Sequence, residues 1–163
     1  VDRYGPRDQI GDDLFHSMKT LPRTGPNENT LIGARSTGPI VGGADWICQS
    51  PDHWLFENTG MKKGDGIPGL VGWEWHGDPA NIPGLEIIAQ GTTESSAGNG
   101  TYTSTVYPGP MGNLVFNAST CWWGDGLSQP PGYVRPSAHG ASPQGPDQRV
   151  QVITANLLKR LSS

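Results

Sequence analysis

The sequence His53-Trp54-Leu55-Phe56-Glu57-Asn58-Thr59-Gly60 opens a segment that closes with Gly72-Trp73-Glu74-Trp75-His76. Two histidines, two glutamates and three tryptophans fall within these 24 residues, separated by glycines. Glycine lets the backbone approach a ligand closely, and tryptophan offers a large amphipathic surface. This composition is typical of a pocket wall carried on an ordered loop. We therefore predict that the loop over residues 53–76 organises both the fold and the functional site.

The whole chain combines much glycine and proline with many aromatic residues. Its 163 residues include 24 glycines and 15 prolines, but also six tryptophans, four tyrosines and three phenylalanines. Disordered chains lack such aromatic surface, so the composition predicts long ordered loops around one hydrophobic core. We expect residues 1–163 to be a single domain or a domain fragment. Because the sequence starts at Val1 rather than at methionine, we expect a fragment of a larger protein.

Charge and hydropathy exclude two classes of partner. The net charge is −4, and no basic run is longer than Lys62-Lys63, so the chain lacks the positive field that attracts nucleic acid. No stretch approaches the roughly 20 apolar residues that span a bilayer. The sequons at Asn99 and Asn117 do not fix the compartment, since the second closes an apolar strand. With no apolar signal segment at the first residues, the sequence favours the cytoplasm slightly over secretion.

The regular elements are expected mainly in the second half of the chain. A run opened by Pro146 and Asp147 has helical spacing of apolar residues and predicts an amphipathic C-terminal helix over 145–162. Three upstream runs predict strands for this helix to cover, over 85–90, 101–107 and 113–117. The third should be central because its apolar run is continuous. The polar stretch 91–100 reads as a loop or hairpin connection, and 12–19 as a weaker helix. The helix's apolar residues are Val150, Ile153, Leu157 and Leu161.

Cys48 and Cys121 both sit beside tryptophans. Two cysteines are too few for a disulfide scaffold or a metal knuckle, although one bridge between them is possible. We expect both to be buried thiols that pack as small apolar residues. Cys121 follows a strand, where a nucleophile could stand, but no nucleophile elbow surrounds it. A packing role is therefore the preferred interpretation for Cys121.

Glu57 and Glu74 are the candidate acid–base groups. Each is flanked by aromatic residues, and the resulting desolvation would raise the carboxyl pKa toward the range useful for proton transfer. The alternative is that each accepts hydrogen bonds from the loop or pairs with Arg35 or Lys63. We favour a functional role for Glu57 and leave Glu74 open.

His53 and His76 could bind a metal together with one of these carboxylates, as two histidines and a carboxylate do in known sites. His53 and Glu57 lie four residues apart and could share a helical face. The glycines that follow, at positions 60, 64 and 66, rule out a long helix there. Ordinary hydrogen-bonded histidines are the preferred interpretation, and we assign no metal to this chain.

Four segments resemble a known family when they are taken in order. They are Ala44-Asp45-Trp46-Ile47-Cys48, His53-Trp54-Leu55-Phe56-Glu57-Asn58-Thr59-Gly60-Met61, Ile67-Pro68-Gly69-Leu70-Val71-Gly72-Trp73-Glu74 and Val115-Phe116-Asn117-Ala118-Ser119. The chain resembles the C-terminal part of the large, catalytic subunit of N,N-dimethylformamidase and the uncharacterised relatives of that subunit. The resemblance covers residues 12–161.

The resemblance implies a fold and an activity. The fold would be α/β, a three-layer sandwich related to class I glutamine amidotransferases, of which this chain supplies the loop-rich later half and the C-terminal helix. The rest of the parent polypeptide, or other subunits, would complete the sheet, and an oligomer is expected. The activity would be an amidohydrolase that cleaves a small formamide to formate and an amine. The intact enzyme would use one iron held by two tyrosines and a glutamate, which we place upstream of Val1.

The resemblance also assigns roles to residues of this chain. No pair among its four tyrosines has surroundings that match the iron ligands, so no cofactor is expected to be held by this chain alone. Glu57 would be the general base for the attacking water, with His53 orienting it. The expected substrate-binding and pocket-wall residues are Asn58, Trp73, Glu74, Asn117, Trp122 and Trp123.

Two alternatives belong to other functional classes. The tryptophan-rich loops could form a carbohydrate-binding or subunit-contact surface, since exposed aromatic rings suit both. The chain could also be a self-assembling structural subunit, because an incomplete sheet leaves an open edge that seeks a partner strand.

Overall fold

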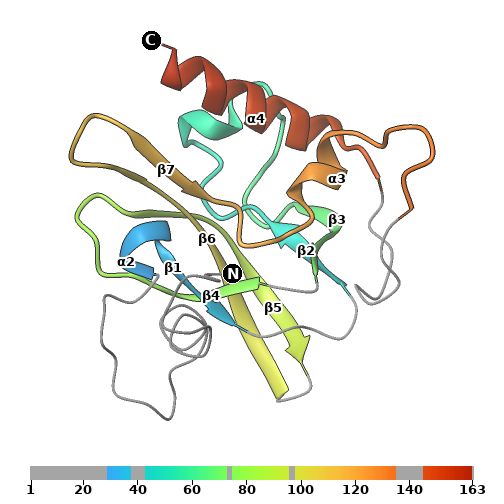
Figure 1. Ribbon diagram of the computed structural model, residues 1–163, viewed down its shortest axis with the longest axis horizontal. Coiled ribbons are helices and arrows are strands. Elements are labelled where there is room, and N and C mark those ends of the chain that lie inside the picture. The colour runs from blue at the N-terminus through green and yellow to red at the C-terminus, as the bar shows by residue number, and fades with distance from the viewer. Residues whose placement is uncertain (1–28, 38–42, 73–74, 96–97, 135–144, 163) are drawn as a thin grey trace, which may run out of the picture.

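The computed structural model describes residues 29–37, 43–72, 75–95, 98–134 and 145–162. The weak helix expected over 12–19 lies outside these residues. The elements in chain order are α2 (Asn29–Ile32), β1 (Ala34–Thr37), β2 (Gly43–Ile47), the 3-10 helix η2 (Trp54–Phe56), β3 (Gly66–Gly72), β4 (Trp75–Pro79), β5 (Glu86–Ser95), β6 (Gly98–Pro108), β7 (Leu114–Asn117), α3 (Trp123–Leu127) and α4 (Gln148–Leu161). Figure 1 shows α4 along one side of the strands, with η2 and α3 beneath it.

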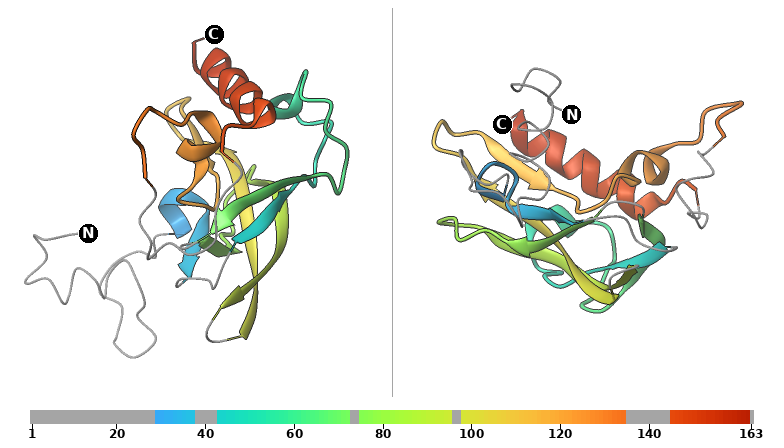
Figure 2. Two further views of the ribbon diagram at one scale, coloured as in Figure 1. Left: turned by 90° about the vertical axis from the view of Figure 1, so that its right-hand side faces the viewer. Right: turned by 60° about the horizontal axis from the view of Figure 1, so that its bottom comes forward.

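The described strands form three small antiparallel sheets, β1–β4, β2–β3 and β5–β6–β7. Single bridges connect them: Cys48 pairs with Ala89, and Trp75 pairs with Thr120. The two views in Figure 2 show β5 and β6 as a long twisted ribbon that extends away from α4. The expected combination of helices and sheet is confirmed as a mixed helix–sheet fold. The three-layer sandwich stays a prediction.

Trp46 on β2 lies at the centre of the core. It is fully buried, its ring meets Phe56 at 6.0 Å and Trp123 at 5.4 Å between centroids, and its indole N–H donates to Ala118 O at 3.0 Å. The hydroxyl of Tyr102 on β6 donates a hydrogen bond to the backbone carbonyl of Asp45, which is next to Trp46 on β2. These contacts join β2, η2, α3 and the central strand β6 into one hydrophobic core.

The predicted C-terminal helix is confirmed, with boundaries at Gln148 and Leu161. Val150 and Ile153 are fully buried and Leu157 packs against the core, but Leu161 is 55% exposed. The prediction that Leu161 belongs to the buried stripe is therefore wrong, since the helix extends past the core at its last turn. No helix in the described ranges is long and apolar enough to cross a membrane.

The three predicted strands are present as β5, β6 and β7, with two corrections. The stretch 91–100 belongs to the β5–β6 hairpin, so the hairpin alternative is confirmed and the loop alternative is wrong, because threonine-rich residues of β5 continue the pairing as far as Ser95 opposite Gly98. Among the described strands β7 lies at the sheet edge, and β6 is central. The apolar run of β7 is explained by helices: Phe116 meets the ring of Trp123 at 5.3 Å, and α2 contacts the same strand.

The segment 53–76 is not a continuous loop as predicted. It contains η2, all of β3 and the start of β4. The glycines and proline of Gly66-Ile67-Pro68-Gly69 obscure the strand pattern of β3, yet Ile67, Leu70 and Val71 are buried in the core. At Gly72 a side chain would collide with the ring of Trp122, so glycine is required there by close packing.

Candidate active site

Glu57 directly follows the 3-10 helix η2, and local sequence explains why it faces outward. Leu55 and Phe56 are buried and fix one side of η2 against the core. Glu57 then turns away and is exposed, and Asn58, also exposed, adopts a left-handed backbone with φ +62°. The prediction that aromatic neighbours desolvate Glu57 is therefore wrong for this chain. The ring of Phe56 is buried in the core and that of Trp54 is half-buried, whereas Glu57 lies at the surface.

An open pocket forms where η2 meets the end of α4. Its lining residues are Trp54, Glu57, Asn156, Lys159 and Arg160. The guanidinium carbon of Arg160 lies 5.8 Å from the centre of the Trp54 ring, within the range of a cation–π contact. The pocket therefore combines one carboxylate, two cationic side chains and an aromatic wall.

Asn156 connects the two sides of this pocket. Its side-chain Nδ2 donates to the carbonyl oxygen of Leu55 at 2.9 Å and to that of Glu57 at 2.8 Å. Three α4 residues in this pocket, Asn156, Lys159 and Arg160, were missed from the sequence. The sequence showed that basic residues lie near the end of the predicted helix, but its pattern did not indicate which loop these residues would face.

His53 is the N-cap of η2. Its Nδ1 accepts the backbone N–H of Leu55 at 3.3 Å, so its Nε2 carries the proton in the neutral ring and lies 3.6 Å from a carboxylate oxygen of Glu86. Burial lowers the pKa of His53, and Glu86 opposes that effect only in part. His53 does not line the described pocket. The predicted role of His53 in orienting Glu57 stays a prediction.

His76, Asn117 and Ser119 form a separate polar cluster between β4 and β7. Asn117 Oδ1 accepts the backbone N–H of Ser119 at 2.8 Å and lies 2.9 Å from His76 Nδ1, which must therefore donate. The hydroxyl of Ser119 donates to His76 O at 2.6 Å. Asn117 is buried, as expected from its place in an apolar strand, and its Nδ2 has no partner among the described residues.

The predicted pocket-wall tryptophans belong to the core. Trp122 is buried over Gly72, and Trp123 is half-buried and donates its indole N–H to Thr154 Oγ1 at 3.0 Å. Asn58 follows Glu57 in the chain, but neither Asn58 nor Asn117, Trp122 or Trp123 lines the pocket. Trp73 and Glu74 lie outside the described residues. Trp46 and Trp75 are also buried, so among the described tryptophans it is the half-buried Trp54, on the Glu57 pocket, whose ring is left at a surface that a carbohydrate could reach.

The described residues do not fit an iron site of two tyrosines and a glutamate. The hydroxyl of Tyr102 donates to Asp45 O at 2.6 Å and accepts the N–H of Ile47 at 2.6 Å. The hydroxyl of Tyr107 donates to Leu31 O at 2.7 Å. Within the same part of the chain, no three histidine, cysteine, aspartate or glutamate side chains gather closely enough to hold a metal ion. His53 and His76 therefore do not form the facial set considered from the sequence.

The two cysteines are both thiols, and they differ in exposure. Cys48 is fully buried as expected, and burial raises its pKa to about 11. Cys121 is exposed, with its thiol 3.3 Å from Gly72 O. The prediction that Cys121 is buried is wrong, because Trp122 and not Cys121 fills the space over Gly72.

The fold and the site define a mixed helix–sheet domain that carries a glutamate on an open pocket. A family model described as "N,N-dimethylformamidase beta subunit-like, C-terminal" matches residues 6–138, and the chain belongs to this family. The match begins before residue 12, where the resemblance was placed, and ends before α4. No curated protein and no solved structure shows significant similarity to the chain.

Proposed function

We propose that this chain is part of a formamidase-like amidohydrolase that hydrolyses the C–N bond of a small formamide. In this proposal it supplies a pocket wall and the general base, Glu57. One observation carries the proposal: in a member of the dimethylformamidase family, Glu57 lines an open pocket, and its backbone carbonyl is fixed by a hydrogen bond from Asn156, while its carboxylate makes no ion pair within the described part of the chain. A carboxylate in that setting can still accept a proton.

The chemistry asked of Glu57 is a proton transfer. A water bound in the pocket gives a proton to the Glu57 carboxylate, and its oxygen attacks the formyl carbon. The C–N bond then breaks, the proton passes to the leaving nitrogen, and formate and an amine are released. Lys159 and Arg160 line the same pocket, and their charge favours the anionic intermediate and formate.

Other parts of the protein would complete this site. Glu57 is exposed in this chain, and water must be excluded for efficient proton transfer, so we propose that further polypeptide covers the pocket, within an oligomer. The sandwich fold, with this chain as its later half, would provide that neighbour. Any iron would be held outside the described residues, and no step above depends on it.

The other candidate site residues keep proposed roles, and the structure supports some of these roles better than others. Asn58 is exposed beside Glu57 and would contact the substrate directly. Asn117 offers a buried Nδ2 donor that a bound carbonyl could satisfy, although it is not part of the Glu57 pocket. We propose Trp122 and Trp123 as support for the wall. His53, Trp73 and Glu74 keep their sequence-based assignments.

The experiment is a substrate assay on the full-length protein, purified with its companion polypeptides. Formamide, N-methylformamide and N,N-dimethylformamide are each incubated with the protein, and formate is measured. We expect formate release that saturates with substrate. If formate never exceeds the uncatalysed rate, while titration with glycans changes the tryptophan fluorescence, the amidohydrolase proposal fails and the carbohydrate-binding alternative gains.

A further inference from the structure

We infer that Asn156 is the positioning residue for Glu57, holding the base in the geometry that proton transfer requires. The inference rests on the proposed function of Glu57 and extends it to α4. The family match ends at residue 138, so the match itself says nothing about this helix. The assignment comes from contacts between residues about 100 positions apart.

One amide group of Asn156 fixes both ends of the turn that carries Glu57. Nδ2 has two hydrogens, and they are used on Leu55 O at 2.9 Å and Glu57 O at 2.8 Å. The 3-10 helix before the turn has only three residues and cannot hold its own end rigidly. Fixing the carbonyl of Glu57 fixes the peptide plane beside its Cα, and hence the direction in which its Cα–Cβ bond leaves the backbone.

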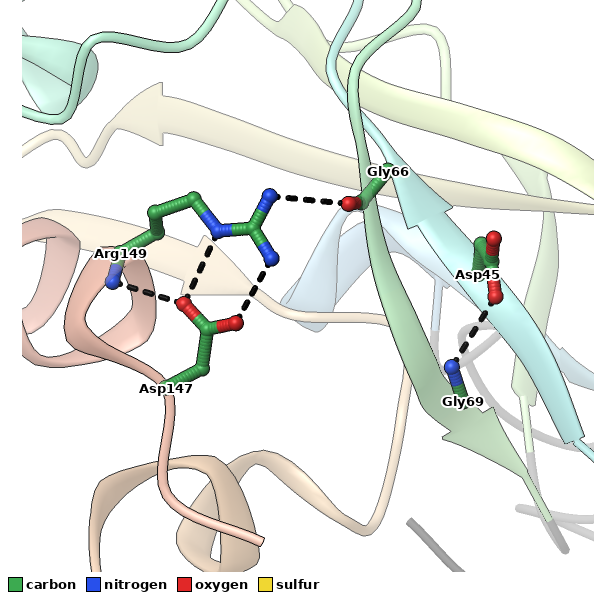
Figure 3. A network of polar contacts seen from close by, with 5 residues as sticks. All are labelled: Asp45, Gly66, Gly69, Asp147 and Arg149. Atoms are coloured by element: carbon green, nitrogen blue, oxygen red, sulfur yellow. Dashed lines mark hydrogen bonds and ion pairs between the residues drawn. The ribbon is translucent and has the colours of Figure 1, made fainter. Parts of the chain in front are cut away.

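The support under Asn156 is itself rigid. Val150 and Ile153 of α4 are fully buried, so the helix cannot slide easily. At its start, Arg149 binds the Asp147 carboxylate through two nitrogens and donates to Gly66 O of β3 at 2.9 Å, as Figure 3 shows. Asn156 therefore holds the backbone of Glu57 in a fixed position relative to the core, although Glu57 itself is exposed.

The helix offers a matched control in Gln151. Its side chain Nε2 donates to Leu127 O at 2.9 Å, which is the same kind of bond from the same helix. That bond connects α4 to α3 and not to the turn with Glu57. If Asn156 only stabilises the fold, loss of either side chain should have similar consequences.

The experiment compares Asn156→Ala, Gln151→Ala and Glu57→Gln in the full-length protein with its companion polypeptides. A misplaced base costs turnover rather than substrate binding, so we expect kcat of Asn156→Ala to fall by about 10-fold to 100-fold with KM within about twofold. Gln151→Ala should keep kcat within about twofold. If both variants turn over formamide at the same rate, the inference is overturned.

A double-mutant cycle separates positioning from general stabilisation. If Asn156 acts through Glu57, adding Asn156→Ala to Glu57→Gln should lower kcat by no more than about twofold beyond Glu57→Gln alone. Independent losses that multiply would overturn the inference.

Asn156→Asp, which keeps the shape of the side chain but cannot donate a hydrogen bond, replaces Asn156→Ala if that variant does not fold, and the same outcomes are expected. If Glu57→Gln itself turns over normally, the proposed function of Glu57 fails and takes the inference with it. A large loss in Glu57→Gln with normal Asn156 variants removes the inference alone.

Discussion

At the scale of single residues, burial decides which groups near the site can react. Cys48 lies in the core and itself forms the bridge to Ala89, whereas Cys121 lies at the surface, two residues after the buried Ser119. A thiol must ionise and be reached before it reacts with an alkylating reagent. Burial opposes both for Cys48, and its pKa of about 11 keeps it protonated at neutral pH.

We therefore predict that iodoacetamide labels one cysteine of this chain in the native protein at pH 8. Cys121 should be modified, and Cys48 should react only in denaturant. Peptide mass spectrometry after brief labelling distinguishes the two sites, and Cys121→Ser should abolish the native labelling. Labelling of Cys48 at a rate similar to that of Cys121 would contradict the buried environment assigned to it.

His53 gives a prediction about stability and pH. Its folded pKa is lowered by burial, so as the pH falls below about 6.5 the unfolded chain binds a proton before the folded chain does. The contribution of neutral His53 is thus present at pH 7.5 and declines toward pH 5. His53→Asn keeps an acceptor for the N–H of Leu55 but cannot titrate.

The prediction is that the loss of stability between pH 7.5 and pH 5 is smaller in His53→Asn than in the wild type. Urea unfolding at both pH values measures the difference. An equal or greater loss in the variant would mean that His53 is not the group that senses pH.

At the scale of elements, the start of α4 is held by Asp147 and Arg149. Asp147 caps the helix by accepting the N–H of Arg149 at 2.8 Å, and the side-chain hydrogen bonds from Arg149 hold the Asp147 pKa below its usual range. In Figure 3 the same arginine reaches Gly66, next to the contact of Asp45 with Gly69 at 3.0 Å. The cap therefore joins α4 to β3.

Asp147→Ala should lower the opening free energy of α4 by about 1 kcal/mol at pH 7, the usual contribution of an N-cap. Asp147→Asn, which still accepts, should cost less. Because the folded pKa of Asp147 is lowered, the ionised group stabilises above the usual carboxyl range, and the cost of Asp147→Ala should shrink as the pH falls through the folded pKa. Hydrogen exchange of the α4 peptides measures this. Unchanged exchange in Asp147→Ala would contradict the capping role.

The elements differ in how far the sequence could predict them. The helix α4 was predictable because Val150 and Ile153 have helical spacing and Asp147 marks the start. The strand β3 was missed because Pro68 and its glycines resemble a turn, and its strand conformation depends on pairing with β2. Glu57 could be singled out from its aromatic neighbours, but its exposure could not. Asn156 was out of reach, since only the packing of α4 brings it to Glu57.

At the scale of the whole molecule, the chain presents its candidate base on an outer face. Trp46 packs β2 against η2 and α3 in the core, single bridges connect the three small sheets, and the Glu57 pocket lies where η2 meets the end of α4. Membership of the dimethylformamidase family is consistent with further polypeptide parts in the whole protein, and we propose that they cover this face. The central claim is therefore that Glu57 acts as the base of a formamide-hydrolysing site shared with the rest of the protein.

The most direct test is the turnover of N,N-dimethylformamide by Glu57→Gln in the full-length protein, measured as formate released, with Asp78→Asn as the control. Asp78 is also an exposed carboxylate, but it lies on β4 and does not line the pocket. The account predicts that kcat falls about 100-fold or more in Glu57→Gln, the usual contribution of a general base, and stays within about twofold in Asp78→Asn. Wild-type turnover in Glu57→Gln would contradict it.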